Sequence, residues 1–184
     1  MSFTFKKLSI PDVIIIEPKI FPDERGAFFE LFKQSIFEQN EINVKYVQDN
    51  ISVSNLNVLR GLHFQKTPKS QAKLITVLQG EIFDVAVDIR KNSPTYGKWV
   101  GEILSETNRK LLFIPEGFAH GFCTLRENTI VMYKVSNEYS SELERSIIWN
   151  DPEINISWPI KNPILSEKDS QATILKNVDN NFEF

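Results

Sequence analysis

Cysteine and histidine are almost absent from this chain of 184 residues, which has one cysteine, Cys123, and two histidines, His63 and His120. A single cysteine can form neither an intrachain disulfide nor a zinc site of several thiolates, which is typical of a reducing compartment. We therefore expect a cytoplasmic protein. Two histidines are too few for a three-histidine metal centre within one chain, so we expect no bound metal.

A surplus of positive charge and a long apolar segment are also missing. The 21 basic and 24 acidic residues give a formal net charge of -3, which argues against the broad basic surface of nucleic-acid-binding proteins. The apolar run at residues 13–16 is too short for a signal-peptide core or a membrane span. The seven glycines form no GxGxxG or GxxxxGK[ST] pattern, which argues against a nucleotide-binding α/β enzyme. We expect no nucleic-acid partner and no membrane partner.

The composition is that of a folded domain. Hydrophobic residues make up 41% of the chain and include 14 phenylalanines, which is enough apolar material for a sizeable core. The length suits one such core, and no repeat, low-complexity tract or Ser/Gly linker interrupts the chain. We expect a single domain over residues 1–184.

Short apolar segments separated by turn residues recur along the chain, which indicates the strands of an antiparallel sandwich or barrel. In residues 82–89, the side chains of Phe83 and Val85 fall on one face and those of Asp84 and Ala86 on the other, the pattern of a strand packed on one side. Helical signals are confined to residues 33–41 and a segment that begins at Ser166. The predicted fold is mostly β, with strands near residues 13–16, 28–32, 51–54, 74–78, 82–89, 99–104, 111–114, 118–125 and 129–135.

Both histidines lie in strand-like segments. His63 shares a predicted strand face with Gly61 and Gln65, and the missing side chain of Gly61 leaves room for a ligand to approach the imidazole. The alternative is a histidine that only satisfies a hydrogen bond in the core, and periodicity alone favours this alternative. His120 lies between two phenylalanines of one strand face, and its alternative role is an interior polar residue that bridges strands.

Other side chains capable of chemistry have structural alternatives as well. Tyr133 projects from an apolar strand face, where its hydroxyl group needs a partner. Asp169 lies at the position where a carboxylate caps the start of the predicted C-terminal helix. Arg25, Arg60 and Lys73 have apolar or glycine neighbours, where a cation either extends to solvent or meets an anion. The spacing alone leaves both interpretations open.

Nine sequence runs, taken together and in order, are similar to the dTDP-4-dehydrorhamnose 3,5-epimerase family. They span nearly the whole chain, and although one run would be weak, nine are specific. The runs are FPDERG (21–26), QDN (48–50), LRGLHFQ (59–65), AKL (72–74), GEIFDVAVDIR (80–90), SPTYG (93–97), IPEGFAHGF (114–122), WNDP (149–152) and LSEKD (165–169).

The resemblance implies a cupin-type jelly roll, a double-stranded β-helix with a few short helices, that forms a homodimer and uses no metal or other cofactor. It also implies inversion of C3 and C5 in a nucleotide-linked 4-keto-6-deoxy sugar, from dTDP-4-dehydro-6-deoxy-D-glucose to dTDP-4-dehydro-L-rhamnose. The 4-keto group acidifies the protons at C3 and C5. A base can therefore remove one and leave an enolate, and an acid can return a proton to the opposite face.

The resemblance also assigns roles to individual residues. His63 is implied to be the base, and Asp169 the carboxylate that orients its imidazole. Tyr133 is implied to return the proton, and Lys73 to face the oxyanion that develops on C4. The N-terminal part of the neighbouring subunit is implied to contribute to each site. The residues implied to bind the substrate are Phe21, Arg25, Glu30, Gln48, Asn50, Arg60, His120 and Tyr139.

A few positions depart from the family pattern. Glu138, Ser146 and Ile148 differ from many members near the nucleotide end, and Ala72 replaces the usual glycine before the lysine, but the acid–base set is intact. The alternatives of the same chemistry are a 3,5-epimerase of a GDP-linked 4-keto-6-deoxy-heptose and an epimerase that inverts C3 only. A non-catalytic sugar-binding cupin is disfavoured because a binder needs no base and acid on opposite faces. A metal-dependent cupin enzyme lacks ligands.

Overall fold

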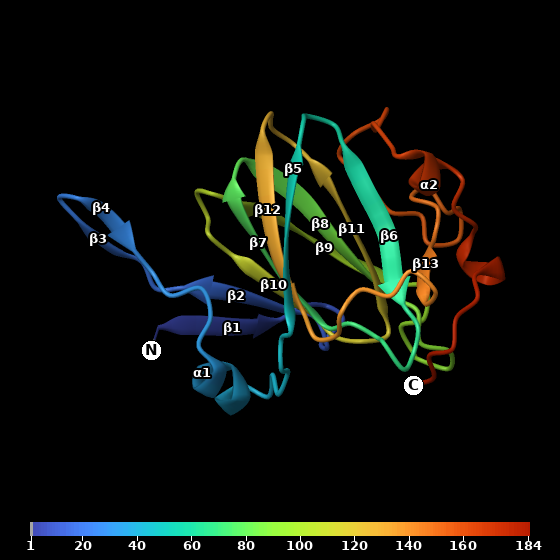
Figure 1. The fold of residues 1–184 in the computed structure, drawn as a ribbon, viewed down its shortest axis with the longest axis horizontal. Coiled ribbons are helices and arrows are strands. Elements are labelled where there is room, and N and C mark those ends of the chain that lie inside the picture. The colour runs from blue at the N-terminus through green and yellow to red at the C-terminus, as the bar shows by residue number, and fades with distance from the viewer. Residues whose placement is uncertain (1) are drawn as a thin grey trace.

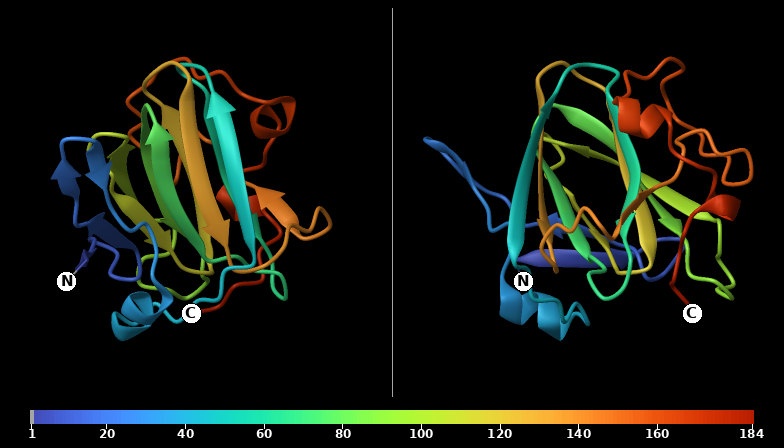
Figure 2. Two further views of the ribbon diagram at one scale, coloured as in Figure 1. Left: turned by 60° about the vertical axis from the view of Figure 1, so that its left-hand side comes forward. Right: turned by 45° about the vertical axis from the view of Figure 1, so that its right-hand side comes forward.

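The computed structural model describes residues 2–184 and consists mainly of two antiparallel sheets that face one another (Figures 1 and 2). The first sheet has the order β1 (Phe3–Lys7), β2 (Ile14–Pro18), β10 (Leu111–Ile114), β7 (Lys73–Gln79), β12 (Thr129–Val135), β5 (Gln48–Ser54). The second has the order β13 (Glu144–Ser146), β6 (Leu59–Gln65), β11 (Phe118–Thr124), β8 (Glu81–Asp88), β9 (Trp99–Ser105). This arrangement confirms the predicted cupin-type jelly roll.

A two-stranded hairpin and three short helical segments accompany the two sheets. The strands β3 (Phe21–Asp23) and β4 (Gly26–Phe28) form a hairpin that projects from the body of the molecule (Figure 1). The helices are α1 (Gln34–Gln39), α2 (Glu167–Ser170) and a 3-10 turn (Leu175–Asn177). Both predicted helices are confirmed in place, although α1 is shorter than the predicted range. No helix among residues 2–184 is both long enough and apolar enough to cross a membrane.

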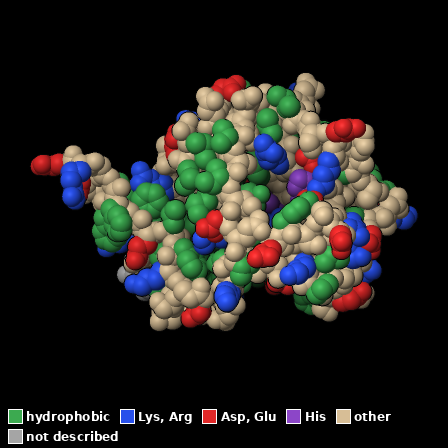
Figure 3. Space-filling view, in the orientation of Figure 1, with side chains coloured by type: hydrophobic (Ala, Val, Ile, Leu, Met, Phe, Trp, Pro, Cys, Tyr) green, Lys and Arg blue, Asp and Glu red, His purple; other side chains and the backbone are tan. Residues whose placement is uncertain are grey.

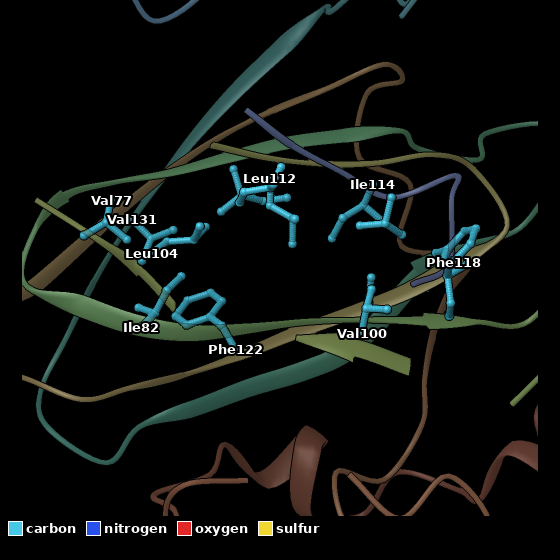
Figure 4. Packing of buried hydrophobic residues seen from close by; sticks show 14 residues of the cluster. Val77, Ile82, Val100, Leu104, Leu112, Ile114, Phe118, Phe122 and Val131 are labelled. Atoms are coloured by element: carbon cyan, nitrogen blue, oxygen red, sulfur yellow. The ribbon is translucent and has the colours of Figure 1, made fainter. Parts of the chain in front are cut away.

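Apolar side chains from both sheets fill one end of the barrel. Val77, Leu112 and Val131 from the first sheet point toward Ile82 and Phe122 from the second (Figure 4). Burial of such side chains is the main favourable term in folding, about 1.5–3 kcal/mol for each large one. Because the apolar residues are concentrated at this end, the other end of the barrel is left to polar residues.

The C-terminal segment covers the outer face of the second sheet. Ile147, Ile154 and Leu175 pack there against Val85 and Val87 of β8. The prediction that residues 82–89 pack on one side is therefore wrong, since both faces of this strand are buried. Alternation alone could not show this, because the covering segment is remote in the sequence and contributes no strand pattern of its own.

The predicted strand at residues 28–32 is also wrong. Only Phe28 lies in a strand, and the following residues form an irregular segment. In this segment Phe32 packs edge-on against Phe37 of α1, with ring centroids 4.8 Å apart. Phe32 thus anchors this segment to a helix, and an apolar pattern alone does not distinguish such an anchor from a strand.

Strand β5 is unusual because its polar side chains face the barrel and its apolar side chains face outward. Gln48, Asn50 and Ser52 alternate with exposed residues along the strand. Ile51 and Val53 are 65% and 63% exposed. The polar inner face makes the inside of the barrel suited to a polar ligand, and the outer face leaves exposed apolar side chains on an edge strand.

Candidate active site

Two adjoining cavities open at the polar end of the barrel, and both are lined by His63, Lys73 and Tyr133. Figure 3 shows a histidine side chain in a hollow on this face, with basic side chains beside it. The first cavity, of about 210 Å³, is also lined by Ser52, Arg60, His120, Phe122, Ser166, Lys168 and Asp169. The second, of about 170 Å³, is also lined by Gln48, Asn50, Phe64, Gln65, Gln71, Tyr139 and Glu144.

A larger hollow of about 720 Å³ lies elsewhere, beside the hairpin, and is lined by Phe29, Leu78 and Arg109 among others. The guanidinium group of Arg109 lies over the ring of Phe29, 4.6 Å from its centroid. None of the predicted acid–base residues lines this hollow. Chemistry and not size therefore identifies the candidate site.

His63 and Asp169 form a hydrogen-bonded pair at the wall of the first cavity. The His63 Nε2 atom lies 2.5 Å from Asp169 Oδ1, and the carboxylate is buried while the imidazole is partly open to the cavity. Burial alone would raise the pKa of Asp169, but the hydrogen bond and charge of His63 outweigh it and hold the pKa below its ordinary value. Asp169 is therefore an anion suited to orienting His63 and to stabilising its protonated form.

Asp169 also belongs to the start of a helix, as its spacing from Ser166 predicts. The Asp169 backbone N–H donates to the Ser166 hydroxyl oxygen at 3.1 Å, and Ser166 is the N-cap of α2. The helix cap and the histidine partner are thus not alternatives. The cap fixes the backbone of Asp169, and the fixed backbone directs the carboxylate at His63.

Gly61 does not leave room for a ligand, contrary to what its position in the sequence predicts, but allows two strands to approach closely. A Cβ atom on Gly61 would lie 2.5 Å from the Cα atom of Gly121 and 2.7 Å from the carbonyl oxygen of His120. The space beside Gly61 is therefore filled by the backbone of β11 and is not room for a ligand. Glycine is needed because β6 and β11 approach closely behind the two histidines.

Replacing Gly61 with alanine is expected to destabilise the fold by about 3 kcal/mol or more, because the clash adds to an unfavourable backbone angle, φ +123°. Urea unfolding monitored by fluorescence measures this change. Gly26→Ala is a matched control, since Gly26 has φ +133° but no atom within 4 Å of its added Cβ. Equal losses in the two variants would show that crowding at Gly61 contributes nothing.

Lys73 lies at the start of β7 and is only 7% exposed. Its Nζ atom donates a hydrogen bond to the backbone carbonyl of His63 at 3.3 Å. Burial lowers the pKa of Lys73 to about 8, although the charges of Asp84 and Glu144 partly oppose this shift. At neutral pH a cation is thus held on the cavity wall, where it can stabilise a developing negative charge.

His120 bridges two strands, in agreement with the structural role proposed for it from the sequence. Its Nε2 atom lies 2.6 Å from Oδ1 of Asp84, which is completely buried on the neighbouring strand β8. Burial lowers the pKa of His120 despite the attraction of Asp84. Asp84 was not among the predicted site residues, although a carboxylate in the apolar run of β8 was a signal that could have revealed it.

Tyr133 occupies the wall opposite His63, since β12 and β6 belong to different sheets. Its pKa is raised, mainly by burial, so the phenol keeps its proton at neutral pH. A histidine that can accept a proton and a tyrosine that can donate one therefore lie on opposite sides of one cavity. This arrangement suits removal of a proton from one face of a substrate and its return to the other.

Gln48, Asn50 and Tyr139 come together at the second cavity, as predicted. Gln48 accepts a hydrogen bond from the Tyr139 backbone N–H at 3.0 Å and donates one to Asn50 Oδ1 at 2.8 Å. Gln65 holds the same loop from below, since it donates to the carbonyl of Glu138 and accepts from the N–H of Ser140. The Glu138 side chain itself is exposed. The loop that presents the Tyr139 ring is thus fixed on both sides.

Two charged residues at the cavities, Glu144 and Lys168, were not predicted from the sequence. Glu144 binds the Lys168 ammonium group and accepts a hydrogen bond from the Tyr139 hydroxyl at 2.8 Å. Burial would raise the pKa of Glu144, but hydrogen bonds from Lys168 and Tyr139 bring it below its ordinary value. The position of Lys168 directly before Asp169 was the one available signal, whereas nothing in the sequence near Glu144 indicates the cavity.

Three predicted substrate-binding residues do not line either cavity of this chain. Phe21 and Arg25 lie on the projecting hairpin of β3 and β4, where Arg25 pairs with Asp23, and Glu30 follows the hairpin. Arg60, by contrast, is in place and donates a hydrogen bond to Ser54 at 3.1 Å. The prediction for Phe21, Arg25 and Glu30 thus requires a second chain.

Among residues 2–184, no three His, Cys, Asp or Glu side chains lie together as a group that could hold a metal ion. The two histidines of the site each pair with a different aspartate. The acid–base side chains that line the cavities are suited to transferring protons to and from a bound substrate.

Comparison with known proteins also indicates an epimerase. The family model for dTDP-4-dehydrorhamnose 3,5-epimerase matches residues 7–177. The chain belongs to the dTDP-4-dehydrorhamnose 3,5-epimerase family. Its resemblance to that family, predicted from nine sequence runs, is thereby confirmed, and so is its assignment as an isomerase.

Individual members show how close the relation is. A dTDP-4-dehydrorhamnose 3,5-epimerase of Shigella flexneri is 57% identical over 164 residues, which cover 89% of this chain and 91% of the relative. A similar crystal structure is that of a dTDP-6-deoxy-D-glucose 3,5-epimerase from Legionella pneumophila in complex with dTDP-4-keto-L-rhamnose. Its sequence is 46% identical to this chain, and the two structures match with a TM-score of 0.93 over 96% of this chain and 95% of that one.

A more distant relative is named for a different activity. A 3'-monoepimerase from Streptomyces bikiniensis, in complex with dTDP-quinovose, is 32% identical with a TM-score of 0.87, and the match covers 92% of this chain and 86% of that one. The same fold thus occurs in an enzyme named for one inversion.

Proposed function

We propose that this enzyme converts dTDP-4-dehydro-6-deoxy-D-glucose to dTDP-4-dehydro-L-rhamnose by inverting C3 and C5. The observation that carries the proposal is one cavity with the His63–Asp169 pair on one wall and Tyr133 on the other. The relatives named for this reaction, with identities of 57% and 46%, support the choice of substrate.

The reaction begins with proton removal from C3 or C5. His63 holds Asp169 with Nε2, so Nδ1 is the ring nitrogen free to accept the proton. The electrons of the broken C–H bond move into the C4 carbonyl and produce an enolate. Lys73, a buried cation on the cavity wall, stabilises the negative oxygen.

The reaction ends when a proton returns to the other face of the same carbon. Tyr133 keeps its proton at neutral pH and lies on the wall opposite His63, so it is the donor. Donation leaves a phenolate on Tyr133 and an imidazolium on His63, and exchange with solvent restores both groups. The two steps then repeat at the second carbon, and no electrons are gained or lost.

The nucleotide portion is proposed to occupy the second cavity, where the ring of Tyr139 is exposed for stacking on the base. Arg60 and Lys168 provide cations near the sugar cavity for the pyrophosphate. His120 and Asn50 border the sugar. Lys168 is paired with Glu144, so it must exchange this carboxylate for a phosphate oxygen when the substrate binds.

We also propose a homodimer in which Phe21, Arg25 and Glu30 complete the site of the neighbouring subunit. The support is the projecting hairpin, on which Phe21 is 44% exposed, together with the exposed apolar face of β5 (Figure 1). An apolar strand face of this kind is typical of a protein interface.

We place the enzyme in the cytoplasm, because Cys123 is a buried free thiol that suits reducing conditions.

Incubation in heavy water tests the proposal directly. With the dTDP-linked 4-keto-6-deoxy sugar we expect two deuterium atoms in the product, one at C3 and one at C5, because each inversion exchanges one carbon-bound proton. Mass spectrometry counts the deuterium atoms and NMR locates them. The GDP-linked sugar, incubated in parallel, is the control for nucleotide preference.

The other outcomes assign the enzyme elsewhere. Faster exchange with a GDP-linked heptose would replace the substrate but keep the mechanism. Deuterium at C3 alone would make the enzyme a monoepimerase. Binding without any exchange would favour the non-catalytic sugar-binding protein and would contradict the proposed chemistry.

A further inference from the structure

One serine hydroxyl on the cavity wall has no partner within the described residues. Strand β5 directs four polar side chains toward the barrel, from Gln48, Asn50, Ser52 and Ser54. Three of them are engaged: Gln48 binds Tyr139 and Asn50, and Ser54 binds Arg60. The Oγ atom of Ser52 is buried and forms no hydrogen bond with any of residues 2–184.

The position of Ser52 explains what such a hydroxyl can do. Ser52 lines the first cavity together with Arg60 and Tyr133. On β5 it lies between Asn50, which pairs with Tyr133 across the ladder, and Ser54, which holds Arg60. It thus lies between the proposed proton donor and a cation proposed to contact the substrate.

A buried hydroxyl without a partner is unfavourable for folding, so proteins rarely keep one without a reason. An alanine in its place would fill the same part of the strand without the polar atom. The hydroxyl is accounted for if the Ser52 side chain turns to another staggered rotamer when a ligand fills the cavity, because the hydrogen bond then forms only in the complex.

We infer that Ser52 is a substrate-binding residue whose hydroxyl donates a hydrogen bond to an oxygen of the bound sugar nucleotide. The acceptor is an oxygen of the sugar or of the adjoining phosphate, the two groups that reach the wall between Tyr133 and Arg60. The inference rests on the proposed function and adds a residue to its binding site.

The test compares Ser52→Ala with the wild-type enzyme. Loss of one hydrogen bond to the substrate is expected to lower kcat/KM about tenfold. The melting temperature should stay the same or rise, because the variant no longer buries an unpaired hydroxyl. A purely structural serine would give the reverse, a lower melting temperature with unchanged kinetics.

Two further variants sharpen the comparison. Tyr46→Phe is a matched control, since the Tyr46 hydroxyl is also buried without a partner but belongs to the cluster around Phe37, away from both cavities. It should leave kcat/KM unchanged. Ser52→Thr keeps a hydroxyl and should restore most of the activity that Ser52→Ala loses, which also covers the case in which the alanine variant folds poorly.

Binding of dTDP alone identifies the acceptor. An equal loss of dTDP affinity in Ser52→Ala would assign the hydrogen bond to phosphate, and a loss confined to the sugar nucleotide would assign it to the sugar. Wild-type turnover with unchanged kinetics in Ser52→Ala would overturn this inference and leave the proposed function standing. A wild-type enzyme without turnover would refute the proposed function, and this inference with it.

Discussion

Replacing His63 with alanine is expected to lower kcat by about 10³-fold, because general bases contribute roughly 10²- to 10⁴-fold to such reactions. Affinity for dTDP should change by about twofold at most, since His63 is proposed to act on the sugar and not on the nucleotide. Steady-state kinetics and calorimetric titration with dTDP measure the two quantities. Unchanged turnover would refute the assignment of His63 as the base.

The same experiment extends to Asp169, which is 2.5 Å from His63. Because the two residues act as a unit, Asp169→Asn combined with His63→Ala should lose little more than His63→Ala alone. Asp179→Asn is the matched control, since Asp179 belongs to the same C-terminal segment but pairs with Lys66 and Arg145 at the surface. Additive losses from His63→Ala and Asp169→Asn would show that the two residues act independently.

Replacing Lys73 with methionine is expected to lower kcat by about 10²- to 10³-fold, the size found when one group that stabilises an oxyanion is removed. Methionine has a similar length and apolar stem, so the buried site should remain filled. Lys110→Met is the control, because Lys110 pairs with Glu17 away from the cavities. Rapid kinetics with the dTDP-linked substrate measures the change, and a loss confined to KM would contradict a role for Lys73 on the enolate.

The activity of the wild-type enzyme should depend on pH through the charge of Lys73. The pKa of Lys73 is lowered by burial to about 8, so the ammonium group is present below this pH and lost as the pH rises through it. Activity should therefore fall above about pH 8 if the cation is required. This descending limb should be absent in Lys73→Met, and its persistence there would assign it to another group.

The sequence predicted the acid–base residues better than the surfaces around them. His63, Lys73 and Tyr133 were assigned by resemblance, and the structure brings all three to one cavity. Their catalytic roles stay predictions until the variants are measured. Alternation along strands was sufficient to predict most of the sheet, because side-chain direction in a strand repeats every two residues.

Other features depend on contacts that a linear pattern does not contain. Asp84 is buried because it shares the inward face of β8 with Ile82 and Ala86, where His120 faces it from the next strand. Gly61 appeared to leave a gap, which the backbone of β11 fills. In both cases the deciding neighbour is distant in the sequence, so only the folded chain reveals it.

The inverted pattern of β5 has a consequence for how the enzyme can change. β5 is an edge strand, bonded only to β12 in its sheet. A slip of one residue along β12 would turn Ile51 and Val53 into the sugar cavity and carry the polar side chains to the outer face. The register of β5 on β12 is thus fixed by both of its faces, because only the observed register places polar side chains in the cavity and apolar side chains on the outer face. A mutation that shifts this register should therefore impair substrate binding and the proposed subunit association together.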